Sequence, residues 1–271
     1  MKLMTQIYKK SVQINKETDE KIYTNPVLSK DELIFLYEID STIHSFGYDK
    51  DPRIKEIRNT RNLDEDIQTI FECTKDQLAT SPNEVNENTK AYIGEWNPTI
   101  YQTIQNYPNI THLYESFPDK KIFTYELATD TSIKSPEQAK QKLESKGIWI
   151  SDYGKGLLEK TEFSQEQTQY KLVQFTVKQL GFSQDATTDQ IYTKAQELGL
   201  KLCPAEVGPL LRLSYEGKDW KLIAMKQIIG RDGYPSVFNL GSGAVKLWLD
   251  GNSAYPVGRW SSDYQFVFLA S

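Results

Sequence analysis

The chain has 271 residues, a formal net charge of −5 and 25% charged residues, which is ordinary globular usage. Its acidity argues against a duplex-DNA binder, because neutralisation of phosphates supplies most of that affinity, and no nucleic-acid partner is expected. A content of 12% aromatic residues argues against a mainly disordered chain, and the length favours two domains.

The N-terminus lacks the apolar core of a secretory signal, and no apolar run approaches the roughly 18 residues that span a bilayer. We therefore expect a soluble, cytoplasmic protein with no membrane association. Residues 1–28 are polar, so we predict a loosely held N-terminal segment. Its apolar residues suit either a short strand or packing on a neighbouring element: Leu3, Ile7, Val12 and Ile14.

Residues 29–160 are predicted to form a mixed α/β module. Ser29, followed by acidic residues, begins a helix, and the apolar run 33–39 suits either a buried helix or a buried strand. Further helix starts are Pro52, Asn97-Pro98 and Ser135-Pro136. Strands are predicted at 67–73, 112–114, 122–127 and 148–150, and 152–159 suits one or two helical turns.

Polar residues 160–169 predict a linker, after which 165–271 form a smaller, mostly antiparallel β module with one helix. Thr187 and Gln190 make a capping box for that helix, which runs through Leu198. Strand or turn structure is expected at 200–213, strands are expected at 172–177, 221–228, 236–240, 245–249 and 264–269, and glycine turns at 230–233, 241–243 and 250–251. The predicted fold class is α+β.

Cys203 and Glu206 lie in the segment Cys-Pro-Ala-Glu and are candidate catalytic residues, with His112 as a candidate base. A nucleophilic cysteine needs a base within hydrogen-bond reach, and the only histidines, His44 and His112, lie in the other module. The competing interpretation makes Cys203 a small buried hydrophobe, unreactive at neutral pH. A hydrolase or transferase that uses Cys203 or a carboxylate pair is the alternative function.

No metal or cofactor is expected. Two cysteines and two histidines, all isolated, are poor material for zinc. The acidic runs 49–51 and 64–66 lack the glycine and terminal glutamate of a calcium loop, and the glycines lack the phosphate-loop and dinucleotide patterns.

Aromatic residues crowd the last fifty residues, and candidate binding residues among them are Trp248, Tyr255 and Trp260, together with Arg259. Rigid aromatic side chains beside arginine are favoured in recognition surfaces. Packing in the β core is the competing interpretation. The sequence therefore predicts a binding or interaction protein that recognises a glycan or a peptide, with a protein or glycan partner.

Several stretches resemble one uncharacterised bacterial protein family: LIFLYEID (33–40), FGYDKDPRIKEIR (46–58), NENTKAYIGEW (86–96), LGLKLCPAEVGPLLRLSY (198–215) and GRWSSDYQFVFL (258–269). The resemblance implies a bacterial source and a portable C-terminal module. It implies no activity. Relatives end in basic residues after the last strand, whereas this chain ends Leu269-Ala270-Ser271.

Overall fold

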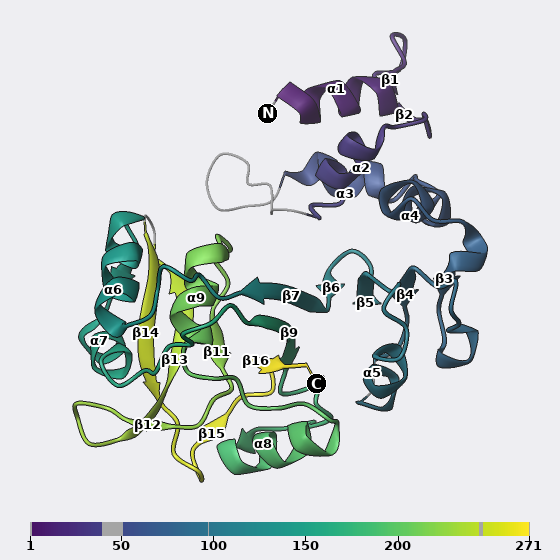
Figure 1. Ribbon diagram of the computed structural model, residues 1–271. Helices are drawn as coiled ribbons and strands as arrows, with labels where there is room; N and C mark the ends of the chain where they lie inside the picture. The colour runs from purple at the N-terminus through teal and green to yellow at the C-terminus, as the bar shows by residue number, and fades with distance from the viewer. Residues whose placement is uncertain (1, 40–50, 97, 244–245, 271) are drawn as a thin grey trace. The chain divides into compact units, whose positions relative to one another are not determined.

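The computed structural model describes residues 2–39, 51–96, 98–243 and 246–270 and has an α+β fold with mixed sheets (Figure 1). It divides into two compact units. Unit 1 comprises Met1–Glu95 and Ile104–Lys121, and unit 2 comprises Trp96–Thr103 and Ile122–Ser271. The predicted linker at 160–169 therefore lies inside unit 2. None of the helices in the described ranges is long and apolar enough to cross a bilayer.

Unit 1 begins with helix α1 (Lys2–Ser11) and the antiparallel hairpin of β1 (Val12–Ile14) and β2 (Lys21–Tyr23). Helices α2 (Lys30–Leu36), α3 (Pro52–Arg58) and α4 (Leu63–Phe71) follow. Strands β3 (Leu78–Ala79), β4 (Ala91–Ile93), β5 (His112–Ser116) and β6 (Lys120–Lys121) form a four-stranded sheet in that order. The pairs β3–β4 and β4–β5 are parallel, and β5–β6 is antiparallel.

Two predictions in unit 1 were wrong. The N-terminal segment is not loosely held, because Lys2–Ser11 form helix α1, whose Met4 and Ile7, one turn apart, are buried in the core of the unit. The predicted strand at 67–73 is instead α4, which buries Ile67, Ile70 and Phe71 at helical spacing. Acidic residues in the first turn of α4 favour the helix, because they face the positive end of its dipole.

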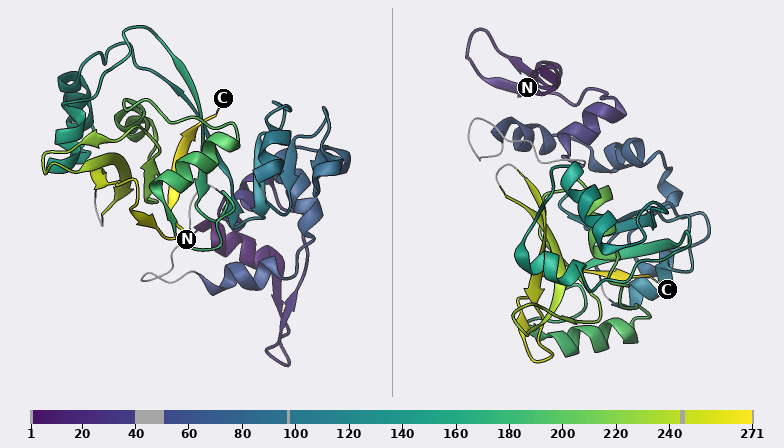
Figure 2. Two further views of the ribbon diagram at one scale, coloured as in Figure 1. Left: turned by 90° about the horizontal axis from the view of Figure 1, so that it is seen from below. Right: turned by 60° about the vertical axis from the view of Figure 1, so that its left-hand side comes forward.

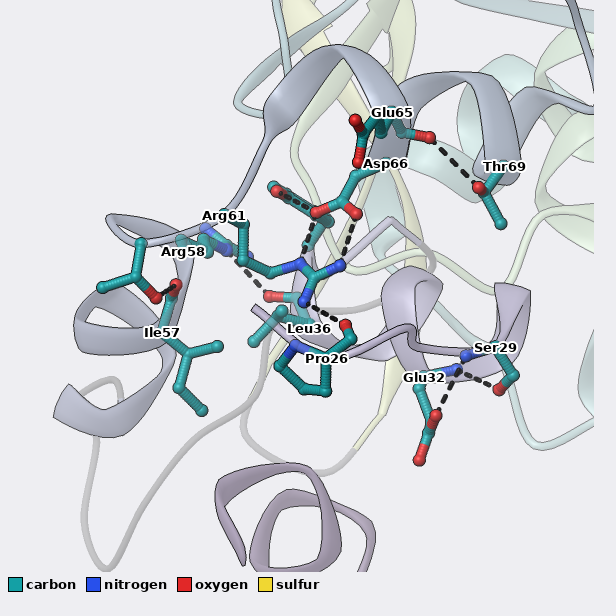
Figure 3. Close-up of polar contacts among 12 residues, drawn as sticks. Pro26, Ser29, Glu32, Leu36, Ile57, Arg58, Arg61, Glu65, Asp66 and Thr69 are labelled. Atoms are coloured by element: carbon teal, nitrogen blue, oxygen red, sulfur yellow. Dashed lines mark hydrogen bonds and ion pairs between the residues drawn. The ribbon is translucent and has the colours of Figure 1, made fainter. Parts of the chain in front are cut away.

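A buried ion pair ties the helices of unit 1 together (Figure 3). The Arg61 and Asp66 side chains are each only 4% exposed, and Arg61 Nη2 lies 2.6 Å from Asp66 Oδ1. Tyr37 donates its hydroxyl to Asp66 at 2.8 Å, and Arg61 donates to the carbonyl oxygen of Pro26 at 3.0 Å. Acceptors from two segments, Asp66 and Pro26, therefore compensate the buried guanidinium, while Tyr37 from a third segment donates to the same carboxylate.

Unit 2 is built on an eight-stranded sheet, of which seven strands follow the order β7-β9-β16-β11-β13-β14-β8. These strands are β7 (Phe123–Ala128), β8 (Trp149–Ile150), β9 (Gln169–Thr176), β11 (Lys221–Ile223), β13 (Pro235–Ser242), β14 (Leu247–Ser253) and β16 (Gln265–Leu269). The eighth, β12 (Ile228–Ile229), pairs with β13. Among the described strands of this sheet, β11–β16 and β14–β8 pair in parallel and the other pairs are antiparallel. The sheet is therefore mostly antiparallel, as predicted for the strands of 165–271, but it also takes in β7 and β8, which were assigned to the first module.

Helices lie on both faces of this sheet (Figures 1 and 2). The α7 helix (Asp152–Leu158) packs so closely on β14 that a Cβ atom at Gly251 would lie 3.0 Å from Leu157. Gly208 of α9 (Val207–Ser214) similarly meets the Phe238 ring on that face, and α6 (Pro136–Ser145) adjoins α9. The α8 helix (Thr188–Glu197) covers the opposite face, where Phe266 lies.

The remaining elements of unit 2 are α5 (Pro98–Ile104), most of which belongs to it, and a small sheet of β10 (Ala186–Thr187) and β15 (Arg259–Trp260). The capping box predicted at Thr187 and Gln190 is confirmed and begins α8. At the helix start predicted at Ser135, the Ser135 side chain accepts from Gln138 N, and the Gln138 side chain accepts from Lys134 N.

Two predictions in unit 2 were also wrong. The described part of 165–271 contains two helices rather than one, because the expected strand or turn around Leu210 and Leu211 is α9. Residues 250–251 are not a turn but the middle of β14. The connection between β13 and β14 lies earlier, where Gly243 N donates to Lys246 O.

A second buried cation lies near the middle of the sheet of unit 2. Lys221 of β11 is fully buried, and its Nζ lies 2.9 Å from Asp219 Oδ2 and 2.8 Å from the Tyr125 hydroxyl. Burial lowers the pKa of Lys221 to about 8, against the opposing effect of Asp219. The Asp219 carboxylate therefore offsets part of the free-energy cost of burying a charged lysine inside the sheet.

We expect a fragment of residues 165–271 not to fold alone, because it lacks β7, β8 and the helices α6 and α7. Without them, the buried residues of β9 and β14 are left uncovered. A fragment of residues 122–271 keeps the whole sheet and is expected to give a dispersed amide proton–nitrogen spectrum. Equal dispersion from the shorter fragment would contradict the topology.

We expect Arg61→Met to destabilise unit 1 by about 3–5 kcal/mol, because it leaves the Asp66 carboxylate buried without its cation. Urea unfolding followed by far-UV circular dichroism measures this. The five tryptophans, Trp96, Trp149, Trp220, Trp248 and Trp260, all belong to unit 2, so their fluorescence reports separately on that unit.

The matched control for Arg61→Met is Lys30→Gln, because Lys30 pairs with Glu72 at an exposed site of the same unit. Exposed pairs contribute about 1 kcal/mol or less. A loss of stability in Arg61→Met no larger than in Lys30→Gln would show that the buried pair does not hold unit 1 together.

Candidate functional site

Trp260, the first of the predicted binding residues, is buried. Its side chain is 5% exposed, its Nε1 donates to Thr188 Oγ1 at 2.9 Å, and its ring packs edge-on against Phe266. The apolar ring of Trp260 is therefore packed inside unit 2, and its indole N–H is hydrogen-bonded there. Trp260 fixes α8 to the sheet and presents no ring to a ligand.

Tyr255 and Arg259 are exposed but make separate contacts. Tyr255 is 39% exposed and its ring lies 5.5 Å from that of Tyr234. Arg259 donates to the carbonyl oxygen of Asp185 and belongs to β15, which pairs with β10. No described contact joins either residue to Trp248, so these contacts do not make the four predicted residues into one patch.

Trp248 belongs to a different surface, which we call the tryptophan row: Gly241, Trp248 and Trp149. These residues are register partners on three neighbouring strands, β13, β14 and β8. Partners in register point to the same face of a sheet. The row is thus one continuous feature at the β8 edge.

Glycine at position 241 is what lets the Trp248 indole lie against the sheet. A Cβ atom there would come within 2.3 Å of the indole ring, so a larger residue would force the ring away. Trp248 is half-buried on this support, whereas the Trp149 side chain on the edge strand is 54% exposed. A supported indole and an exposed indole therefore lie on neighbouring strands.

Polar groups border the row on the same face. Asn239 is two residues from Gly241, and Asp250 is two residues from Trp248. With its carboxamide oriented to satisfy both neighbours, Asn239 accepts from Trp220 Nε1 at 2.8 Å and donates to Asp250 O at 3.2 Å. The Trp220 ring in turn lies 4.9 Å from the ring of Tyr264, which is 41% exposed.

Sequence reasoning missed Trp149 because it assigned 148–150 to the first module. The signal was present in Ile148-Trp149-Ile150, where alternation places the indole on the face opposite its neighbours. Its partnership with Trp248 is a parallel pairing across about a hundred residues, and no local pattern marks such a pairing.

Cys203 and Glu206 border a separate cavity of about 670 Å³, together with Phe163, Ser164 and Tyr170. Cys203 is 4% exposed and its thiol donates to Val267 O at 3.5 Å. Burial raises the pKa of that thiol far above its usual range. The thiolate needed for nucleophilic attack is therefore suppressed, and this cavity supplies no nucleophilic cysteine.

Glu206 holds two segments of unit 2 together. Its Oε2 accepts from Ser164 N at 2.9 Å, and its Oε1 accepts from Tyr170 OH at 2.7 Å and from Ser164 Oγ. Three donors thus occupy a carboxylate that is 2% exposed. Buried polar groups are normally hydrogen-bonded, and these three bonds satisfy that requirement for Glu206. No catalytic role is needed to explain why this side chain is buried.

His112 lies in unit 1, where its ring stacks on Phe71 at 4.2 Å and burial lowers its pKa. His44 and Asp49 lie outside the described residues. Asp66, in the second acidic run, is the partner of Arg61. No group of three or more potential metal ligands occurs among histidine, cysteine, aspartate and glutamate residues in the described ranges.

No protein-family model matches the chain, and searches of curated proteins and of solved structures also found no match. The resemblance to an uncharacterised bacterial family therefore stays a prediction.

We expect Cys203 to resist thiol reagents in the native protein at pH 8, because its sulfur is buried and its pKa is raised. Labelling with a chromogenic disulfide reagent measures this, with Cys73→Ser used to isolate Cys203. Labelling should become fast only in denaturant. Rapid native labelling that Cys203→Ser abolishes would restore the catalytic interpretation.

Proposed function

We propose that this chain is a binding protein without a catalytic role of its own, and that it recognises a glycan through the tryptophan row. The observation that carries the proposal is the exposed Trp149 beside Trp248, which rests on Gly241. Aromatic side chains are large, rigid anchors whose ordering costs little entropy. The chain therefore has a preformed apolar platform.

The character of the platform favours a sugar over an extended peptide. The C–H face of a sugar ring is apolar and stacks on an indole, while its hydroxyls need polar partners at the rim. Here the rim holds Asn252 and Asp250, both half-buried. A peptide that added a strand would need a long sheet edge, but β8 has only two residues before Ser151 caps α7.

We expect Trp149→Ala to weaken binding of a recognised glycan about tenfold or more, because truncation of a central aromatic anchor costs more than 1 kcal/mol. A glycan panel identifies the ligand for wild-type protein, and titration calorimetry gives the dissociation constants. Trp149 is largely exposed, so its loss should leave the thermal unfolding midpoint nearly unchanged.

The matched control is Tyr153→Ala, which removes another exposed aromatic ring, on helix α7. It should bind the same glycan as wild type does. Absence of glycan binding by wild-type protein, or equal loss in both variants, would contradict the proposal. A peptide panel run in parallel tests the other ligand class: peptide binding lost in Trp149→Ala would replace the glycan.

A further inference from the structure

A second cavity of unit 2, of about 290 Å³, has positively charged walls. Lys146 directly follows α6, and Arg212 lies on α9. Lys218 follows α9, and Lys246 precedes β14. These elements meet at one end of the unit (Figure 1). Glu216 is the one carboxylate in the wall, so four cations oppose a single acid in a chain whose net charge is −5.

Arg212 is a buried cation that has no carboxylate in ion-pair contact among the described residues, and Asp219 and Glu216 act on it only at longer range. It is 1% exposed, and its guanidinium donates to the carbonyl oxygens of Gly241, Gly217 and Tyr215. Its Nε has no hydrogen-bond partner, and no carboxylate of the described residues forms an ion pair with it. Carbonyl dipoles satisfy some of its N–H groups but leave its net charge in place.

Two other buried cations of the chain, unlike Arg212, each form an ion pair with a carboxylate. Arg61 is paired with Asp66, and Lys221 is paired with Asp219. Burial of a charge costs several kcal/mol unless an opposite charge compensates it. Arg212 is therefore the exception within one molecule, and it lines a cavity large enough to admit the missing anion.

A ligand in solution cannot reach the buried Arg212 side chain directly, but it can reach three lysine side chains in the same wall. Lys146, Lys218 and Lys246 are exposed, and none of them forms an ion pair with a described carboxylate. Lys146 Nζ is placed at the cavity by a bond of 2.9 Å to Leu213 O. Ammonium groups that rotate freely are effective point-charge partners for phosphate oxygens.

We propose that this cavity is an anion site that takes the phosphate group of a small phosphate ester, contacted by Lys146, Lys218 and Lys246 above the buried charge of Arg212. The wall has four cationic side chains and one carboxylate, Glu216, which leaves an excess of three positive charges. A group with more than one negative charge suits such a wall. A volume near the lower end of small-molecule sites suits a phosphate with a small substituent rather than a long chain. The two sites touch at one point, because Arg212 donates to the carbonyl oxygen of Gly241, a member of the tryptophan row. The cavity wall itself contains none of Gly241, Trp248 and Trp149. Lysine variants of the wall therefore test this proposal without changing the row.

Inorganic phosphate and pyrophosphate are the probes. Phosphorus NMR line broadening and titration calorimetry on the full chain, at fixed ionic strength, should show saturable binding to wild-type protein. Replacement of a single lysine, Lys146→Gln or Lys246→Gln, should weaken it roughly fivefold, as expected for one partly exposed charge contact. The double variant should weaken it more than either single variant.

The matched control is Lys178→Gln with Lys201→Gln, which removes the same charge from exposed lysines of unit 2 that do not line the cavity. It should bind like wild type. Equal weakening in both double variants, or no saturable binding beyond that of chloride, would overturn the site and leave Arg212 as an anchor for the turn at 215–217. Because the lysines are exposed, this test does not depend on whether Arg212→Met folds.

Discussion

Compensation of buried positive charge is the constraint on which both units depend. Arg61 joins helices of unit 1 through Asp66, Tyr37 and Pro26, and Lys221 lies inside the sheet of unit 2 against Asp219 and Tyr125. Apolar packing alone tolerates many alternative arrangements, whereas a buried ion needs its partners at defined positions. In each unit, the segments around the cation are therefore held in one relative arrangement by the requirements of a single charged side chain.

Local signals in the sequence predicted the α+β class and most helix starts, because caps and prolines act within a few residues. Thr187 with Gln190 and Pro52 are examples. Prediction was wrong where the spacing of apolar residues in a short segment fitted both the two-residue repeat of a strand and the roughly 3.6-residue repeat of a helix. Ile67, Thr69, Phe71 and Cys73 alternate like a strand, yet Ile67, Ile70 and Phe71 form the buried stripe of a helix. The placement of β7 and β8 in the sheet of unit 2 was beyond local reasoning, since their partners lie some 50 to 100 residues later.

The candidate site was also predictable only where a signal within a few residues was sufficient. Alternation along β14 is enough to place Trp248 on the face opposite Leu249. Trp260 is followed by the polar residues 261–263, which suit an exposed position, but Thr188 offers a buried acceptor for its Nε1 and allows the ring to be buried. Which aromatic rings face solvent is decided by elements that pack on them. The sequence near each tryptophan does not contain that information.

The glycine contacts of α7 have a thermodynamic consequence for the binding proposed at the tryptophan row. Gly154 and Gly251 let the backbones of α7 and β14 approach within van der Waals contact, behind the strand that carries Trp248. A strand supported in this way has little freedom to lose when a ligand arrives, and ordering of the receptor is a major cost of association. Binding at such a rigid surface should therefore show a small entropic penalty and an association rate free of any slow conformational step.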